Sequence, residues 1–331
     1  CPRTIKERPM KKLLTVSIAA YNAEKYLKNC LDSILGSKHL DQIEILIQDD
    51  GSKDGTKNIA LDFCNKYPGI VFLNSTTNGG YGATINRSLS QATGKYFKLL
   101  DSDDSFDAKE LDKLMEFLDS YDKDLLVVSH KVVNVSTKKE QLFRFPNSKN
   151  LSGIGRWDIV IKTDVLKAVS YSFPSKLFFT DNLFCALCFS LSDSFEAKDF
   201  CVYVYNVGIS GQSTEPVQDK KKLSKIADNV FFIINELIQI KDKYPIKNTD
   251  LSVYLNYLIY ANFSNFIFMI SKISRKEGWK KIKAVKKSLN RLEWKEFGYI
   301  RKIKLAYIRQ KNKFNYLLFS TAFLIYKRIK P

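Results

Sequence analysis

Carboxylate side chains gather in one short segment, Asp101-Ser102-Asp103-Asp104, directly after a run of apolar residues. Residues two apart on an extended segment point to the same side, so we expect Asp101 and Asp103 to face the same way. Carboxylate oxygens are preferred ligands of Mg²⁺ and Mn²⁺, which proteins often hold jointly with substrate phosphates. The segment therefore predicts a divalent metal site that neutralises a departing diphosphate.

Three further polar or glycine-rich clusters come earlier in the chain. They are Ala20-Tyr21-Asn22, the segment from Asp49 to Thr56, and Asn78-Gly79-Gly80-Tyr81-Gly82 with Asn86. Any one of them alone is more typical of a turn or a helix cap. The glycines allow a backbone to approach a ligand closely, but they form neither a Walker A loop nor a dinucleotide-binding fingerprint.

The elements around these clusters alternate between strand and helix. Short apolar runs predict strands over 13–20, 43–48, 70–74 and 96–100, and helical periodicity predicts helices over 23–36, 56–67 and 81–91. This rhythm indicates an α/β fold, Rossmann-like, with a mostly parallel sheet flanked by helices on both faces. Ligands of such sheets bind beyond the carboxyl ends of the strands, where all four clusters fall. A shared site is therefore favoured over four separate turns.

Later segments are less regular. The pattern predicts helices over 109–121 and 181–192, strands over 124–135, 141–145 and 200–207, and a loop over 147–157. Only three Gly or Pro residues interrupt 218–330, so we expect several helices there. Residues 1–9 precede Met10 without periodicity, and we interpret them as a remnant added before the natural start.

Residues 13–107 resemble the nucleotide-binding half of family 2 glycosyltransferases with the GT-A fold, of the type that builds bacterial surface polysaccharides. The segments that carry the resemblance are Val16–Asn22, Asp49–Ser52, Asp54–Thr56, Asn78–Gly80 and Asp101–Asp104. The resemblance extends weakly to about residue 215. It implies a GT-A domain over 10–215, with a nucleotide-binding half (10–107) and an acceptor half (108–215).

The same resemblance implies roles for single residues. Binding of a nucleotide-sugar, usually a UDP-sugar, is implied for Ala20, Tyr21, Asn22, Asp50, Asn78, Gly79, Asp101 and Gln212. Tyr21 and Asp50 would hold the base, Asp101 would lie near the ribose, and Asp103 would bind Mn²⁺ or Mg²⁺. Gln212 lies where relatives have a mobile segment over the diphosphate. This chain departs from the family pattern at Ala19-Ala20, where Pro or Thr is usual.

The catalytic base of inverting members precedes a helix, and the matching segment here is Phe179-Thr180-Asp181-Asn182. The resemblance assigns the base to Asp181, although Asn182 stands where an Asp is common. The alternative is that Thr180 or Asp181 only caps the helix. As a base, Asp181 would take the proton from an acceptor hydroxyl during a single displacement that inverts the anomeric carbon.

The net charge of +18 is concentrated at one end of the sequence. Residues 271–331 contain 19 Lys or Arg and 3 Asp or Glu, whereas the first 270 contain 34 and 32. We therefore expect a basic helical domain over 216–331 that contacts an anionic membrane surface or another subunit. The uncharged stretch 251–270 fits a buried helix better than a transmembrane one, because Asn256, Asn262 and Asn265 interrupt it.

The resemblance and the charge pattern together imply an inverting, metal-dependent transferase that moves a sugar from a UDP-sugar to a glycan or lipid-linked glycan. We expect it in the cytoplasm, peripheral to the inner face of the plasma membrane, and without a nucleic-acid partner. A homo-oligomer is compatible with the sequence. Two alternatives remain: a sugar nucleotidyltransferase, and a catalytically degenerate body that binds membranes or polyanions. Six cysteines are too few for a disulfide scaffold, and Cys185 and Cys188 fit packing rather than zinc binding.

Overall fold

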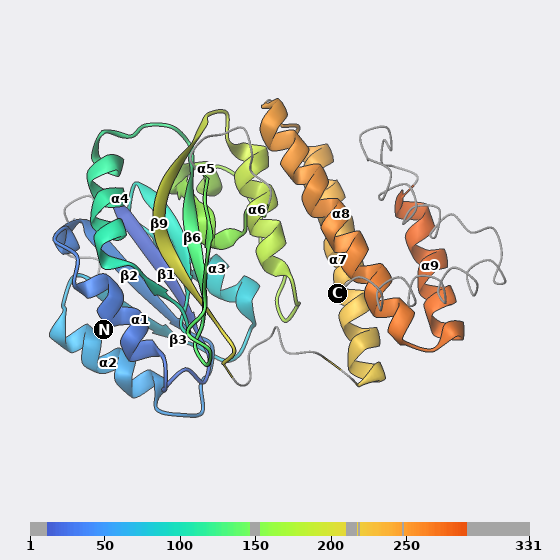
Figure 1. Cartoon of the computed structure of the whole chain (residues 1–331), viewed down its shortest axis with the longest axis horizontal. Coiled ribbons are helices and arrows are strands. Elements are labelled where there is room, and N and C mark those ends of the chain that lie inside the picture. Colours follow the sequence, from blue (N-terminus) through green and yellow to red (C-terminus); the bar gives the residue numbers. More distant parts are fainter. Residues whose placement is uncertain (1–11, 146–152, 210–216, 218, 247, 290–331) are drawn as a thin grey trace. The chain divides into compact units, whose positions relative to one another are not determined.

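The computed structural model describes residues 12–145, 153–209, 217, 219–246 and 248–289 (Figure 1). Contacts divide the chain into two units. The first comprises Cys1–Ser213 with Tyr244–Tyr254, and the second comprises Thr214–Lys243 with Leu255–Pro331.

Four parallel strands form the first half of the sheet in the first unit. They are β1 (Leu14–Ala20), β2 (Ile43–Asp49), β3 (Val71–Ser75) and β4 (Tyr96–Asp101), in the order β3-β2-β1-β4. The register pairs Ala20 with Asp49 and Ala19 with Asp101, so these strands end at the same edge. The predicted parallel βα arrangement is confirmed, and it brings the loops that follow the strands together.

The second half of the sheet is mixed rather than parallel. Strand β8 (Ile159–Lys162) lies antiparallel between β4 and β6 (Leu125–Asn134), and β6 pairs in parallel with β9 (Phe195–Val207). Strand β5 (Ser105–Phe106) pairs with β9, and β7 (Glu140–Phe143) forms a hairpin with β6. The sequence analysis missed β5 and β8, because runs of two and four residues are too short to show a period.

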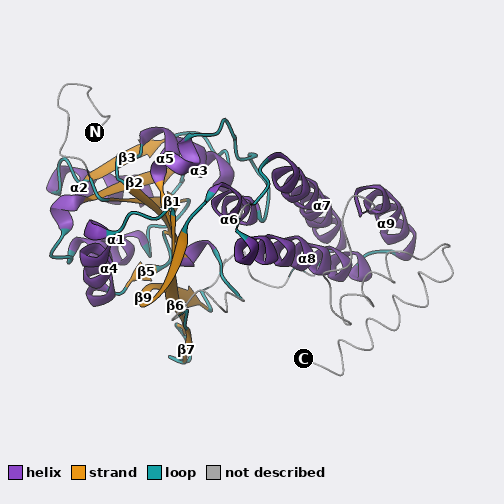
Figure 2. Ribbon diagram, turned by 90° about the horizontal axis from the view of Figure 1, so that it is seen from above, coloured by secondary structure: helices purple, strands orange, loops and turns teal. Residues whose placement is uncertain are grey.

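Helices cover both faces of the sheet, as predicted (Figure 2). On one side lie α1 (Leu27–Leu35), α2 (Thr56–Lys66) and α4 (Ala108–Ser120); on the other lie α3 (Tyr81–Gln91), α5 (Thr163–Lys167) and α6 (Thr180–Leu191). Every residue of β2 is buried, and so is nearly all of β1. Burial on both faces of the central strands stabilises the sheet through the hydrophobic effect. A stable sheet in turn holds the loops that follow β1, β2, β3 and β4 in fixed positions.

The second unit is helical in its described part, as predicted. It contains α7 (Lys220–Lys243), most of α8 (Thr249–Lys272) and α9 (Arg275–Leu289). One helix of the described residues, Asp250–Lys272, is long and apolar enough to cross a membrane, but 56% of its most apolar window is buried within the protein. Burial of this extent fits a packed helix. The apolar run 315–326 lies outside the described residues.

Candidate functional site

The loops after β1 and β2 are joined by hydrogen bonds. The Asp50 amide donates to the Ala20 carbonyl at 2.9 Å, the Asn22 amide donates to Ser52 Oγ at 3.0 Å, and the Lys53 amide donates to Asn22 Oδ1 at 2.8 Å. Asn22 adopts a left-handed backbone with φ 50°, which Asn tolerates better than most residues. Tyr21, held between these anchors, is 52% exposed, so its ring is available to a ligand.

Asp50 organises the glycine-rich loop that follows β3. Its carboxylate accepts hydrogen bonds from the amides of Gly79 (3.0 Å) and Gly80 (2.7 Å) and from Arg87 Nη2 (3.0 Å), and the side chain is buried. Position 80 requires glycine for two reasons: its φ of 80° lies in the left-handed region, and a Cβ there would lie 2.8 Å from the Lys176 amide nitrogen. A carboxylate has about four acceptor positions, so Asp50 can accept one more donor from a ligand. Asn78 is exposed beside it.

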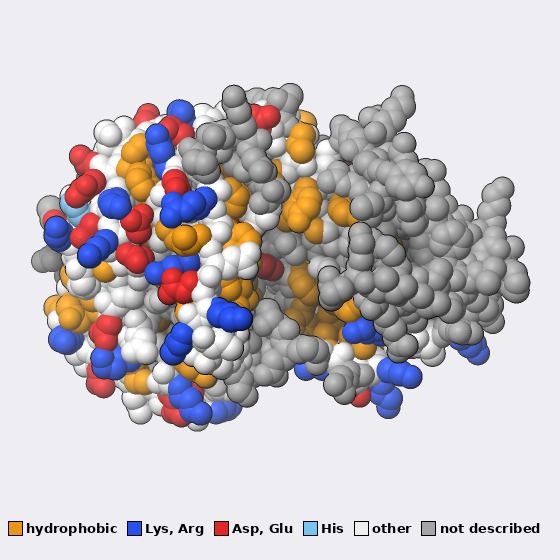
Figure 3. All heavy atoms as spheres, viewed as in Figure 1, with side chains coloured by type: hydrophobic (Ala, Val, Ile, Leu, Met, Phe, Trp, Pro, Cys, Tyr) orange, Lys and Arg blue, Asp and Glu red, His pale blue; other side chains and the backbone are white. Residues whose placement is uncertain are grey.

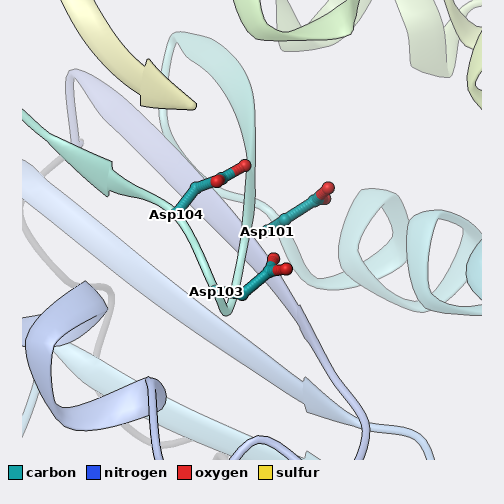
Figure 4. Close-up of side chains that lie close together, drawn as sticks. All are labelled: Asp101, Asp103 and Asp104. Atoms are coloured by element: carbon teal, nitrogen blue, oxygen red, sulfur yellow. The ribbon is translucent and has the colours of Figure 1, made fainter. Parts of the chain in front are cut away.

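The acidic segment forms a tight turn, not the extended segment expected. The Asp104 amide donates to the Asp101 carbonyl at 3.0 Å, and the three carboxyl groups project from the turn together (Figure 4). One oxygen from each lies within 4.8 Å of the others. Hard oxygen donors this close together suit a Mg²⁺ or Mn²⁺ ion.

Strand β9 holds this turn in place. Tyr203 donates its hydroxyl hydrogen to Asp104 Oδ2 at 2.6 Å and accepts from the Asp101 amide at 3.2 Å. Asn206 donates from its backbone to Asp104 Oδ1 at 2.8 Å and from its side chain to the Asp103 carbonyl at 3.0 Å. Burial and the charges of Asp101 and Asp103 raise the pKa of Asp104 well above its ordinary value. Both Asp104 oxygens therefore anchor the turn. The sequence pattern of β9 carried no signal for this role.

Arg156 connects the acidic turn to the predicted base, and the sequence analysis missed it. Its Nη2 pairs with Asp101 Oδ2, its Nη1 donates to Asp181 Oδ2 at 3.3 Å, and its Nε donates to the Tyr81 hydroxyl at 3.0 Å. Tyr81 in turn donates to Asp101 Oδ1 at 3.1 Å, and burial together with Asp101 raises its pKa well above the ordinary value. The side chain of Arg156 is only 13% exposed. A planar guanidinium reaches three separate groups through its fixed fork of five N–H donors, which a compact ammonium lacks.

Asp181 lies in the first turn of α6, but it does not act as the helix cap. The capping position is Phe179, which has no capping oxygen, and Thr180 Oγ1 donates back to the Leu177 carbonyl at 3.0 Å. The capping alternative is therefore wrong. The Asp181 carboxylate faces Arg156 instead and is 31% exposed, which leaves part of it open to solvent.

The short helical turn that carries Arg156 rests on buried polar contacts. Asp158 pairs with His130 Nδ1 at 2.6 Å and accepts from the Gly155 amide at 2.9 Å, while Lys98 Nζ donates to the Trp157 carbonyl at 2.6 Å. The Trp157 ring stacks on Tyr205 at 5.1 Å between centroids, so it packs rather than stands open to a sugar.

Two other expectations have simple outcomes. Gln212 and its neighbours lie outside the described residues. Cys185 and Cys188 are free thiols buried in α6, and burial raises the pKa of both. Their predicted packing role is confirmed.

Residues 15–177 match the family Glycosyl transferase family 2. An uncharacterised glycosyltransferase of Mycoplasma genitalium is 38% identical over 112 residues, which cover 33% of this chain and 37% of that protein. The poly(ribitol-phosphate) β-N-acetylglucosaminyltransferase TarS of Staphylococcus aureus is 26% identical over 267 residues, 78% of this chain and 44% of TarS. The chain thus spans less than half the length of either relative.

Solved structures share the fold. Residues 1–349 of S. aureus TarS, in complex with UDP-GlcNAc, align with a TM-score of 0.70 at 20% identity, covering 94% of this chain and 91% of that one. A mannosyltransferase from Pyrobaculum calidifontis, in complex with GDP-Man and Mn²⁺, aligns with a TM-score of 0.52 at 14% identity, covering 97% and 87%. The α/β fold with its helical C-terminal part is therefore confirmed as that of these transferases.

Proposed function

We propose, from the family 2 glycosyltransferase domain that this chain carries over residues 15–177, that it transfers a sugar from a UDP-sugar to a glycan hydroxyl with inversion. The observation that carries the proposal is the hydrogen-bonded path from the acidic turn through Arg156 to Asp181. It links a donor-side carboxylate to a half-open carboxylate suited to proton removal. The family match favours this function over the sugar nucleotidyltransferase alternative.

The donor's base fits the loops after β1, β2 and β3. Tyr21 offers an exposed ring for stacking, and Asp50 is a buried acceptor for a ring N–H, which uracil supplies. Ala20, Asn22, Asn78 and Gly79 would complete the same binding edge, and Asp101 would lie near the ribose. The UDP-GlcNAc complex of TarS, a relative over 78% of this chain, supports a UDP-sugar.

The diphosphate would lie over the acidic turn. Asp103 would hold a Mn²⁺ or Mg²⁺ ion, with Asp101 beside it and Asp104 shaping the turn from below. When bound, the ion supplies positive charge against which a diphosphate leaves more easily. Tyr203 and Asn206 keep the turn in shape before any ligand arrives, which lowers the reorganisation needed for catalysis.

Asp181 would act as the general base. Its open side can accept the proton of an acceptor hydroxyl, while Arg156 fixes the orientation of the other side. As the acceptor hydroxyl loses its proton to Asp181, its oxygen would attack the anomeric carbon from the face opposite the diphosphate. The transition state would have oxocarbenium character, and the configuration at this carbon would invert.

The acceptor that we propose is a glycan or lipid-linked glycan of the bacterial surface. The similarity to TarS, a poly(ribitol-phosphate) β-N-acetylglucosaminyltransferase, supports a polymer as the acceptor class.

Calorimetric titration of UDP, with and without Mn²⁺, tests the donor site on the wild type and on Asp103→Ala. We expect UDP binding that depends on Mn²⁺ and is lost in the variant. Asp181→Asn should bind UDP like the wild type but transfer sugar about 10²–10⁴-fold more slowly, the usual contribution of a general base. An absence of nucleotide binding under every metal condition would overturn the enzymatic proposal and favour the degenerate-body alternative.

A further inference from the structure

Helices α7 and α9 of the second unit lie side by side and run in the same direction. Ser224 hydrogen-bonds to Glu277, and Asp228 pairs with Lys281. The second contact lies four residues beyond the first on both helices. The two helices are therefore parallel and touch along one line.

Lysines line the outer side of this pair. At about 100° per residue, Lys221 and Lys225 lie on one side of the α7 contact line, roughly opposite the buried residues Leu223 and Val230. On α9, exposed Lys276, Lys280 and Lys283 lie roughly opposite buried Gly278 and Ile282. The lysines of α7 are displaced from the contact line in one rotational sense, and those of α9 in the opposite sense. Because the helices are parallel, both sets lie on the same side of the helix pair. The five residues Lys221, Lys225, Lys276, Lys280 and Lys283 form what we term the lysine face.

The positive charge at the start of α7 does not favour the helix itself. Lys221 of the lysine face lies with Lys220 and Lys222 in the first turn, where the helix dipole disfavours positive charge. The two acids on the contact line, Asp228 and Glu277, are engaged by Lys281 and Ser224. On the face of the first unit seen in Figure 3, basic and acidic side chains are instead interspersed.

An exposed aromatic side chain accompanies these lysines. Phe232 is 43% exposed and falls between Lys221 and Lys225 in angle around α7. On α9, Lys283 Nζ lies 5.6 Å from the centroid of the Trp279 ring. Lysines combined with aromatic side chains are typical of helices that rest on a bilayer surface, where the rings enter the headgroup region. A soluble polyanion without rings or an apolar part, such as polyphosphate, would gain nothing from an exposed Phe.

We propose that the lysine face, with Phe232, docks this chain on an anionic lipid bilayer. This goes beyond the proposed transfer reaction, and it would place the enzyme where a lipid-linked acceptor is found. Each lysine near an anionic leaflet strengthens binding by about 5-fold, so five lysines together should dominate the attraction.

Cosedimentation of the full chain with vesicles tests the proposal. The vesicles contain phosphatidylcholine alone or mixed with phosphatidylglycerol, at one fixed salt concentration. We expect binding only to the anionic vesicles, and a loss of at least about 100-fold when all five lysines of the face are changed to Gln. Phe232→Ser should weaken binding several-fold.

A matched variant controls for net charge. It changes five exposed lysines of the first unit to Gln: Lys25, Lys57, Lys66, Lys109 and Lys139. It should keep most of the vesicle binding, because its charges are removed elsewhere.

Three results would each overturn the proposal: unchanged vesicle binding after loss of the lysine face, an equal loss in the matched variant, or equal binding to neutral vesicles. Binding to long-chain polyphosphate but not to anionic vesicles would assign the face to a soluble polyanion instead. UDP titration of the same variants should match the wild type. A failed donor site and a failed docking face therefore give different results.

Discussion

Replacing Arg156 with Lys should slow sugar transfer while leaving the fold intact. The guanidinium contacts three groups, Tyr81, Asp101 and Asp181, and a compact ammonium can reach only part of this set. A hydrogen bond to a charged group contributes about 1.5–3 kcal/mol. The contact with Asp181 is 3.3 Å long and that carboxylate is 31% exposed, so we take the lower end of the range. About 1.5 kcal/mol corresponds to a loss of roughly 10-fold in kcat.

Two other arginines provide matched controls for the same substitution. Arg87 bonds to Asp50, so Arg87→Lys should weaken UDP binding several-fold and leave kcat close to the wild-type value. Arg144 makes an ion pair with Asp199 and is 56% exposed, so Arg144→Lys should change neither quantity. Transfer is measured as UDP released in the presence of acceptor, and UDP affinity by calorimetry.

The double variant Arg156→Lys with Asp181→Asn decides whether Arg156 acts through Asp181. If it does, adding the Lys substitution to Asp181→Asn changes kcat little, because the group being oriented is already lost. The reasoning is refuted if the two effects multiply, or if Arg156→Lys alone has the kcat of the wild type.

Three further predictions follow from single contacts. Tyr21→Ala should weaken UDP binding about 10- to 100-fold, the usual loss of a base-stacking ring, whereas Tyr21→Phe should keep it in calorimetry. Gly82→Ala should lower the free energy of unfolding by about 1–3 kcal/mol in denaturant titration, because its Cβ would lie 2.2 Å from the Pro174 carbonyl; Gly36→Ala, with its nearest neighbour at 3.8 Å, should stay within about 0.5 kcal/mol. Burial lowers the pKa of Lys98 to about 7, so between pH 7 and 10 the unfolded chain holds a proton that the folded chain has lost. Stability should therefore rise with pH over this range, and Lys98→Met should reduce the rise; an equal slope in both proteins would contradict the cause.

The sequence predicted well which loops meet at one edge of the sheet, and the physical reason is local. Parallel strands end at one edge, so residues that follow the first four strands must meet whatever the later chain does. The pairing of Ala20 with Asp49 and of Ala19 with Asp101 shows this. The shape of the acidic turn was not predictable in the same way. It depends on Tyr203 and Asn206, about 100 residues further along the chain.

Arg156 shows why the surroundings of Asp181 could not be predicted from the sequence. It follows a loop and precedes the short strand β8, so neither periodicity nor a motif marks it. Its position depends on Asp158, His130 and Lys98, which come from three different elements and become neighbours only in the folded sheet. A sequence pattern reports contacts that are close along the chain, or that a regular sheet forces together. The contacts of Arg156 are of neither kind, yet Arg156 is the residue that links Asp101 to Asp181. It binds Asp101, which the parallel strands position, and Asp181, which the later helix α6 positions. The two carboxylates would otherwise be separate ends of a site built from independent halves of the sheet. Because the buried Arg156 side chain pairs with both Asp101 and Asp181, the fold itself sets the distance between these two carboxylates before any ligand binds.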